Sequence, residues 1–515
     1  MAAATSQSPN RPNVLLIMSD EQRWDSLGCN GNRAAHTPHI DALAHRGASF
    51  DHCYVTYPLC CPSRMSLWTG LMPHDHHGLG NWRWLRADLR DRGLVRPFAD
   101  HGYHTIYCGK WHVPGTTPSR MGFADTGAIP AVLNGRDRGR YIEEYRQYAT
   151  AQGYQLVPGH IENLTPSDVV QPEDPNTAHY GTAEIALEHF LETWQTTRFL
   201  EQLDRRPEDR PFFAVCSFNA PHFPMIVPEP YDRLIDPDAI DLSPGFCNGL
   251  EGKPREVIES PYHVTGWSER EWRRLIAHYH GLCALVDAQV GRVLDRLDAT
   301  GELDNTIVVF TSDHGDMLGA HCLNKKGYPL HYEEALRVPL VMDGPGIEPG
   351  ARVEALVSLM DLVPTLAELC GVELDVAHEG IPFARAVTGQ GGWEGRPWVI
   401  SESFHVGGTE SGRGEPADPA VLDLERDGVN VSIRTATHRY IYRLHDHDEL
   451  YELGSDPYEL SNLAGSPEHR SRIDELRHII ATSLDSAVPA VAARIRSSSG
   501  ERMATDSGGK GADSG

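Results

Sequence analysis

Short apolar runs recur along most of the chain and alternate with stretches whose apolar residues recur at helical spacing. The clearest runs cover residues 14–18, 105–108, 212–218, 306–311 and 340–342, and helix-type patterns cover residues 37–46, 63–69 and 268–297. Runs this short and continuously apolar are typical of strands buried on both faces. Their alternation with helices predicts an α/β fold built on one large sheet.

Polar side chains follow four of these predicted strands. In sheets of this kind the carboxyl ends of parallel strands meet at one edge, where ligands collect. We therefore expect these side chains to lie close together and to form the functional site. The residues concerned are Asp20, Lys110, His222 and Asp313.

A glycine-rich stretch at residues 389–395 separates this large domain from a C-terminal part with a different pattern. Short strand-like runs at 398–401, 429–435, 440–443 and 449–453 predict a small antiparallel sheet. We expect a flexible N-terminus at 1–11, a main domain at 12–390, a C-terminal α+β subdomain at 396–495 and a disordered tail at 496–515. Residues 410–419 have the composition of a loop.

The chain is acidic, with 72 Asp and Glu against 46 Lys and Arg among 515 residues, a formal charge of −26. This balance argues against nucleic acid or an anionic membrane as a partner, although a local cationic pocket can still bind a small anion. No run approaches the about 18 apolar residues of a membrane span. The polar N-terminus lacks the apolar core of a signal peptide, so we expect a cytoplasmic protein. Ten scattered cysteines predict mostly buried, reduced thiols.

The stretch from Cys60 to Gly70 reads C-C-P-S-R-M-S-L-W-T-G. It resembles the signature of the type I sulfatases, a branch of the alkaline phosphatase superfamily. The resemblance implies an alkaline phosphatase-like fold, with a large mixed sheet sandwiched by helices and a smaller C-terminal antiparallel subdomain. It also implies that Cys60 is converted to formylglycine by a formylglycine-generating enzyme, whereas Cys61 occupies the variable position. A buried cysteine pair in a turn is the alternative, but several fixed positions at fixed spacing argue against it.

In this family the formylglycine aldehyde binds water to give a geminal diol. One hydroxyl attacks the sulfur of the substrate, and collapse back to the aldehyde then releases sulfate. A thiol cannot follow that route. The resemblance therefore predicts a sulfuric ester hydrolase that cleaves a sulfate monoester to alcohol and sulfate.

Two further segments resemble the metal-binding motifs of the family: N-V-L-L-I-M-S-D at 13–20 and F-T-S-D-H-G-D-M-L-G-A-H at 310–321. The resemblance implies one divalent cation beside formylglycine, bound by Asp20, Asp313 and His314. Many relatives carry a second Asp where this chain has Glu21, which is one methylene longer and is a candidate fourth ligand. Carboxylates with one imidazole make Ca²⁺ our first choice and Mn²⁺ our second.

The segment G-K-W-H at 109–112 resembles another block of the family. By that resemblance Lys110 binds the formylglycine oxygen or a sulfate oxygen, and His112 takes the proton from the remaining hydroxyl. An imidazole has a suitable intrinsic pKa for such a base. The same pair favours a sulfatase over a phosphonate monoester or phosphodiester hydrolase of the superfamily, because those relatives replace it.

The segment A-P-H-F-P at 220–224 and the run N-K-K-G at 324–327 resemble the parts of the family site that face the leaving group. His222 and Lys326 would contact the bridging oxygen and the sulfate, and either could protonate the departing alcohol. We interpret Lys325 as a surface charge. Asn81 lies where many relatives place a substrate-binding Asn.

The cation, Lys110, Lys326 and Arg64 would together neutralise the sulfonyl oxygens, so that positioning and charge stabilisation dominate catalysis. Two alternatives stay open: the phosphonate monoester or phosphodiester hydrolase, and a non-catalytic anion-binding relative in which Cys60 stays a thiol. The expected substrate is a small or sugar sulfate ester. Its identity and the oligomeric state also stay open.

Overall fold

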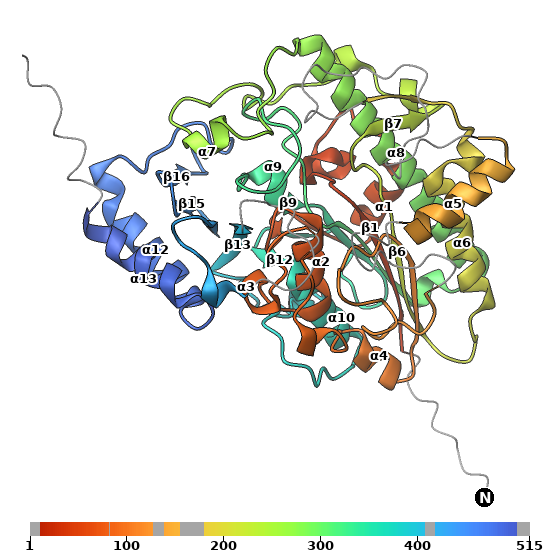
Figure 1. Cartoon of the computed structure of the whole chain (residues 1–515). Coiled ribbons are helices and arrows are strands. Elements are labelled where there is room, and N and C mark those ends of the chain that lie inside the picture. Colours follow the sequence, from red (N-terminus) through yellow and green to blue (C-terminus); the bar gives the residue numbers. More distant parts are fainter. Residues whose placement is uncertain (1–10, 82, 127–138, 155–179, 407–417, 502–515) are drawn as a thin grey trace, which may run out of the picture.

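The computed structural model describes residues 11–81, 83–126, 139–154, 180–406 and 418–501 (Figure 1). Within them a seven-stranded mixed sheet has the order β11-β2-β10-β8-β1-β6-β4. Strands β8, β1, β6 and β4 are parallel neighbours, while β10 runs antiparallel to β8 and β2. The strands are β1 (Asn13–Ser19), β2 (Ala48–Phe50), β4 (His104–Gly109), β6 (Phe212–Ser217), β8 (Thr306–Ser312), β10 (Leu340–Asp343) and β11 (Ala351–Val353). All five strands predicted for the main domain are confirmed.

Helices cover both faces of this sheet (Figure 1). Successive residues of a strand point to opposite faces, so Leu15 and Ile17 of β1 enter one core while Leu16 and Met18 enter the other. The first core is covered by α1 (Pro38–Arg46), α5 (Gly139–Ala151), α6 (Leu191–Arg205) and α8 (Glu269–Ala299), the second by α2 (Cys60–Thr69), α4 (Arg96–Asp100) and α10 (Leu362–Cys370). The predicted α/β sandwich is confirmed.

Shorter elements complete the main domain. Strands β3 (Cys53–Tyr54), β9 (Arg337–Val338) and β12 (Val357–Ser358) form a three-stranded sheet, and β5 (Tyr180–Ala183) pairs with β7 (Met225–Pro228). The short helices are α3 (Pro73–His76), α7 (Arg255–Ile258), α9 (Glu333–Leu336) and α11 (Ala384–Val387). None of the helices in the described part of the chain has the length and apolar content needed to cross a bilayer.

The C-terminal part forms the predicted small antiparallel sheet, whose strands follow the order of the sequence. They are β13 (Trp398–His405), β14 (Gly428–Thr435), β15 (His438–Arg443) and β16 (Glu449–Glu452), covered by α12 (Arg470–Leu484) and α13 (Pro489–Glu501). Helix α13 runs into the predicted tail, so residues 496–501 are helical rather than disordered. The rest of that tail, most of the predicted loop at 410–419 and residues 1–10 lie outside the described residues.

Buried charges join the C-terminal sheet to the main domain, and Lys253 is one of them. Its side chain is 1% exposed. Its Nζ donates to Tyr451 Oη of β16 and to the carbonyl oxygen of Glu459, both at 2.8 Å, and lies 3.5 Å from Glu449 Oε1. It also lies 4.0 Å from the ring centroid of Tyr332. A charge this deeply buried is tolerated because several groups compensate it.

We expect Lys253→Ala to lower the free energy of unfolding by about 3 kcal/mol, because the change leaves Glu449 with fewer compensating charges and opens a cavity. Urea unfolding of both proteins measures the difference. Arg255→Ala is the matched control: its ion pair with Glu259 is largely exposed, so the change should have little effect on stability. Equal losses in the two variants would show that Lys253 does not stabilise the contact between the parts.

Candidate active site

The expected side chains meet at the carboxyl edge of the large sheet. Parallel pairing places Ser19 of β1 opposite Ser312 of β8, and Gly109 of β4 opposite Ser217 of β6. The four strands therefore end at the same level, and the residues that follow them project into one region. Those residues are Asp20, Lys110, His222 and Asp313, as the sequence predicts.

Cys60 is the first residue of α2 and faces this cluster. Its Sγ lies 3.0 Å from His314 Nε2, 3.8 Å from Asp20 Oδ1 and 3.9 Å from Lys110 Nζ. The helix begins three residues earlier than the predicted range 63–69, and Pro62 is tolerated because it lies in the first turn, where its missing N–H breaks no helical hydrogen bond. A helix N-terminus carries a partial positive charge, so this position favours a bound anion.

Arg64 links the two aspartates from one turn further along α2. Its Nη2 lies 3.1 Å from Asp20 Oδ2 and its Nε 2.6 Å from Asp313 Oδ2, with all three side chains fully buried. Its Nη1 donates to Ser217 Oγ at 2.9 Å and to the carbonyl oxygen of Lys110 at 2.8 Å. Arg64 thus orients the carboxylates from within the protein, and its predicted contact with the sulfonyl oxygens stays a prediction.

The remaining atoms of this group fit a divalent cation. Because the two Oδ2 atoms contact Arg64, the Oδ1 atoms of Asp20 and Asp313 are left, and they lie 3.9 and 3.6 Å from His314 Nε2. His314 Nδ1 lies 2.9 Å from the carbonyl oxygen of Gly315 and donates to it, so Nε2 presents a lone pair. One ligand atom each from Asp20, Cys60, Asp313 and His314 lies within 4.8 Å of the others. The two carboxylates suit a hard cation such as Ca²⁺, and the imidazole broadens the choice toward transition metals such as Mn²⁺.

Glu21, the expected fourth ligand, turns to other partners. Its Oε2 pairs with the Lys326 ammonium group and lies 3.6 Å from His222 Nε2. With Asp20 and His222 it forms a second group that could hold a cation. Its backbone N–H donates to Asp313 Oδ1 at 3.2 Å. Its other carboxyl oxygen, Oε1, is buried without a hydrogen-bond partner among the described residues. The role of Glu21 as a ligand stays a prediction.

Opposite charges set the protonation of this buried centre. Burial alone would raise the pKa of Asp20, but the charges of Lys110, at 2.5 Å, and Arg64 outweigh it and hold the pKa well below its usual value. Asp20 is therefore ionised. Burial, together with the Asp20 charge, raises the pKa of the Cys60 thiol to about 12. An unmodified Cys60 would thus be protonated at neutral pH and a weak nucleophile.

His222 and Lys326 both lie beside Glu21 Oε2, and His222 Nε2 also lies 3.9 Å from Asp20 Oδ1. Burial and the neighbouring Lys326 and Lys110 lower the pKa of His222, so its imidazole is neutral in the ligand-free protein. A bound anion beside the ring would favour its protonation. The interpretation of Lys325 as a surface charge is wrong: it is half-buried, and its Nζ lies 4.5 Å from the ring centroid of Phe223.

Two predicted site residues are placed by less direct contacts. Asn81 Oδ1 accepts the backbone N–H of Cys61 at 3.2 Å, so Asn81 supports the start of α2. His112 is buried just beyond Trp111, whose ring stacks on Trp68 of α2 with centroids 5.9 Å apart. This contact fixes the segment that carries Lys110 and His112. Substrate binding by Asn81 and proton transfer by His112 stay predictions.

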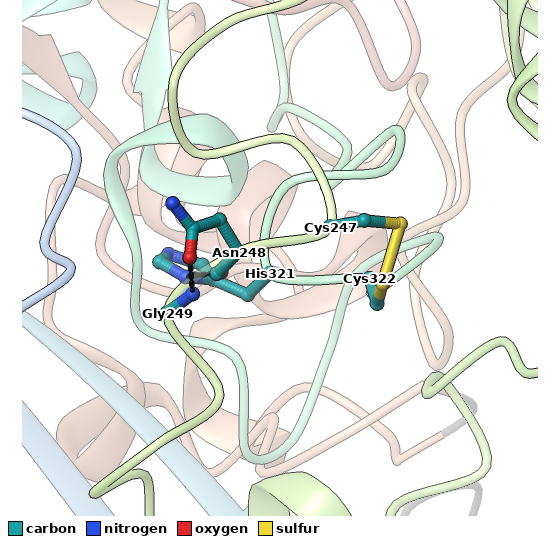
Figure 2. The surroundings of a disulfide bond; sticks show 5 residues. All are labelled: Cys247, Asn248, Gly249, His321 and Cys322. Atoms are coloured by element: carbon teal, nitrogen blue, oxygen red, sulfur yellow. Dashed lines mark hydrogen bonds between the residues drawn. A yellow bond between two sulfur atoms is a disulfide. The ribbon is translucent and has the colours of Figure 1, made fainter.

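A disulfide fastens the segment that follows Asp313. Cys247 and Cys322 are bonded, with Asn248, Gly249 and His321 beside them (Figure 2). His321 Nδ1 lies 3.2 Å from the carbonyl oxygen of Asn248. Cys322 precedes Lys326 by four residues, so the bond restricts the chain that supplies one end of the site. The other eight cysteines are free and mostly buried. The expectation of reduced thiols holds for them and fails for this pair.

Two serines that the sequence analysis left without a role also shape the site. Ser63 Oγ donates to the carbonyl oxygen of Asp313 at 2.6 Å, and Ser217 Oγ accepts from Arg64. Ser63 belongs to the motif around Cys60, and its place in that motif could have indicated that it lies at the site. Ser217 ends a predicted strand, but its contact with Arg64 depends on the order of strands in the sheet.

Buried carboxylates, an imidazole, two lysines and a helix N-terminus converge here on one nucleophile position. The site therefore has the composition of a hydrolytic centre for an anionic ester. Residues 12–372 match the family model described as Sulfatase. Because that match covers more than half of the chain, the protein belongs to the sulfatase family of hydrolases.

Similar proteins agree with this assignment. The chain is 29% identical over 496 residues to an arylsulfatase of Clostridium perfringens, covering 92% of this chain and 95% of that protein. It is 29% identical over 486 residues to the choline-sulfatase of Rhizobium meliloti, a match that covers 90% of this chain and 84% of that protein. The crystal structure of a phosphonate monoester hydrolase of Agrobacterium radiobacter shares the fold, with a TM-score of 0.73 at 24% sequence identity. The match covers 94% of this chain and 96% of that protein.

Proposed function

We propose that this protein hydrolyses a sulfate monoester to an alcohol and sulfate, using formylglycine derived from Cys60 and one divalent cation. The observation that carries the proposal is the position of Cys60. It lies at the N-terminus of α2, within 4 Å of His314 Nε2 and of Lys110 Nζ. The substrate is a small or sugar sulfate ester, and the names of the choline-sulfatase and arylsulfatase relatives support that class.

Formylglycine would supply a hydrated aldehyde whose hydroxyls can attack sulfur and later release sulfate. A buried thiol whose pKa is near 12 would not replace it. Asp20, Asp313 and His314 would hold the cation, which stabilises negative charge on the nucleophile and on the sulfuryl group. Lys110 would hold a sulfuryl oxygen, since its Nζ lies 3.9 Å from Cys60 Sγ.

Departure of the alcohol and release of sulfate need different proton transfers. His222 and Lys326 lie together on the Glu21 side of the site and would assist the alcohol. His112, in the segment of Lys110, would take a proton when sulfate leaves. A proton donor positioned in this way raises the reaction rate by about 10²- to 10⁴-fold.

A substrate panel tests the proposal. Protein co-expressed with a formylglycine-generating enzyme is offered an alkyl, an aryl and a sugar sulfate, a phosphodiester and a phosphonate monoester. We expect kcat/KM for the best sulfate to exceed that for either phosphorus ester by about 10²-fold or more, a difference of about 2.7 kcal/mol in transition-state binding. If a phosphonate were hydrolysed faster than every sulfate, the result would support the alternative function, a phosphonate monoester or phosphodiester hydrolase. The fold is compatible with that function too, since a phosphonate monoester hydrolase shares it.

Two histidine variants should separate the two halves of the reaction. We expect His222→Ala to lower kcat for an alkyl or sugar sulfate by about 10²-fold but for nitrophenyl sulfate by less than about 10-fold, because a good leaving group needs little protonation. We expect His112→Ala to release one equivalent of alcohol rapidly and to retain sulfate on the protein. Single-turnover kinetics with protein mass detection measures both. A slow first turnover without retained sulfate in His112→Ala would require the two roles to be exchanged.

A further inference from the structure

Phe223 lies among the cationic groups on the leaving-group side of the site. Its ring stacks on the imidazole of His222, with centroids 4.5 Å apart and planes inclined by 23°. The ammonium groups of Lys325 and Lys326 lie 4.5 and 4.6 Å from the centroid of the same ring. One aromatic side chain thus contacts both groups proposed to assist the alcohol, His222 and Lys326, and also the ammonium group of Lys325.

The backbone of Phe223 contacts the same groups. Its carbonyl oxygen lies 2.6 Å from His222 Nδ1 and accepts a hydrogen bond from it, so Nε2 is the nitrogen that faces Asp20, at 3.9 Å. Its N–H donates at 3.4 Å to Glu21 Oε2, the oxygen that also pairs with Lys326. The carbonyl contact selects which nitrogen of His222 faces the site, and the ring contact restricts the plane of the imidazole.

The lysine contacts have a physical cause of their own. The face of an aromatic ring carries partial negative charge and attracts an ammonium group. Lys326 is therefore held between the Glu21 carboxylate and the Phe223 ring rather than by the carboxylate alone. Lys325 lies against the ring as well, and this contact keeps a second positive charge near the place where negative charge develops on the leaving oxygen.

We propose that Phe223 is a positioning residue that aligns His222 and Lys326 with the leaving-group oxygen and so sets how well the enzyme cleaves poor leaving groups. The inference rests on the proposed function, since it assumes that these two residues assist departure of an alcohol. It assigns no contact between Phe223 and substrate. The effect should therefore appear in kcat and in leaving-group dependence rather than in KM.

The test compares Phe223→Leu, which keeps apolar volume without a ring, with Phe223→Tyr, which keeps the ring. We expect Phe223→Leu to lower kcat for an alkyl or sugar sulfate by about 10- to 10²-fold, because small misplacements of catalytic groups are costly. For nitrophenyl sulfate the loss should stay below about 3-fold, and KM should change by less than about 2-fold. Phe223→Tyr should retain the leaving-group dependence of the wild type.

A double-mutant cycle distinguishes positioning from general support of the fold. If Phe223 acts largely through His222, Phe223→Leu should add little to the loss already caused by His222→Ala. Equal losses with both ester types, losses that are additive in cycles with both His222→Ala and Lys326→Ala, or a change confined to KM would each overturn the inference. Phe223→Met, which also lacks a ring, replaces the leucine variant if that protein does not fold, and the same outcomes apply.

The wild-type protein in the same assay separates this inference from the proposed function. Sulfate release by the wild type without a selective loss in Phe223→Leu rejects the positioning role alone. A wild type that carries formylglycine and releases no sulfate from any ester rejects the proposed function, and the inference with it.

Discussion

Replacing Cys60 with alanine is expected to lower sulfate release by at least about 10⁴-fold while the protein stays folded, because the change removes the proposed nucleophile. Cys60 is the first residue of α2, and alanine has a high intrinsic preference for helices. The surrounding charge pairs among Arg64, Asp20 and Asp313 do not depend on the sulfur. Initial-rate assays combined with thermal unfolding measure both parts of this expectation.

Cys61→Ala is the matched control. Cys61 is the next residue of α2 and is equally buried, but its side chain occupies the variable position of the motif. We expect this variant to retain activity within about 3-fold, since Asn81 accepts the backbone N–H of Cys61, a contact that alanine keeps. Loss of activity in Cys61→Ala together with an active Cys60→Ala would move the nucleophile to Cys61.

The second large effect is expected for Asp313→Asn, which keeps the shape of the side chain and removes its charge. We expect the variant to lose its bound divalent cation and about 10³-fold or more of its activity, because an amide is a poorer ligand and stabilises less charge. The arginine partner of this carboxylate, Arg64, is fully buried, so some loss of stability should accompany the change. Metal analysis after dialysis, with Ca²⁺ or Mn²⁺ added back, measures the occupancy.

Asp287→Asn is the control for a buried aspartate outside the site. Asp287 on α8 accepts the backbone N–H groups of His39 and Ile40 at the start of α1 and is almost fully buried. We expect this variant to keep one cation per chain and its activity. If Asp313→Asn kept its full cation occupancy, or if both variants lost the same fraction of their cation, Asp313 would not be a ligand.

Much of the sheet follows directly from the sequence. Strands such as residues 14–18 and 306–311 are short and apolar on both faces, and in the fold both lie between two helical layers. Burial on both faces removes the polar positions that would otherwise confuse strand with loop. The site residues Asp20, Lys110 and Asp313 were predictable for the same reason, since each follows a strand whose end is well defined.

The partners of these residues were not predictable. Glu21 faces Lys326 across 305 positions in the sequence, and Cys247 bonds to Cys322 across 75. Such pairs depend on how loops cross the edge of the sheet, which local patterns do not specify. Lys325 looked like a surface charge because a lysine is rarely buried. It is half-buried because its ammonium group lies against the ring of Phe223.

The central claim is that Cys60 acts as formylglycine, and peptide mass spectrometry of residue 60 tests it most directly. Preparations made with increasing amounts of formylglycine-generating enzyme would be compared by the fraction of aldehyde at this position and by kcat for the best sulfate ester. The account predicts that activity is proportional to the aldehyde fraction and vanishes with it. Full activity in protein whose residue 60 is entirely a thiol would contradict it.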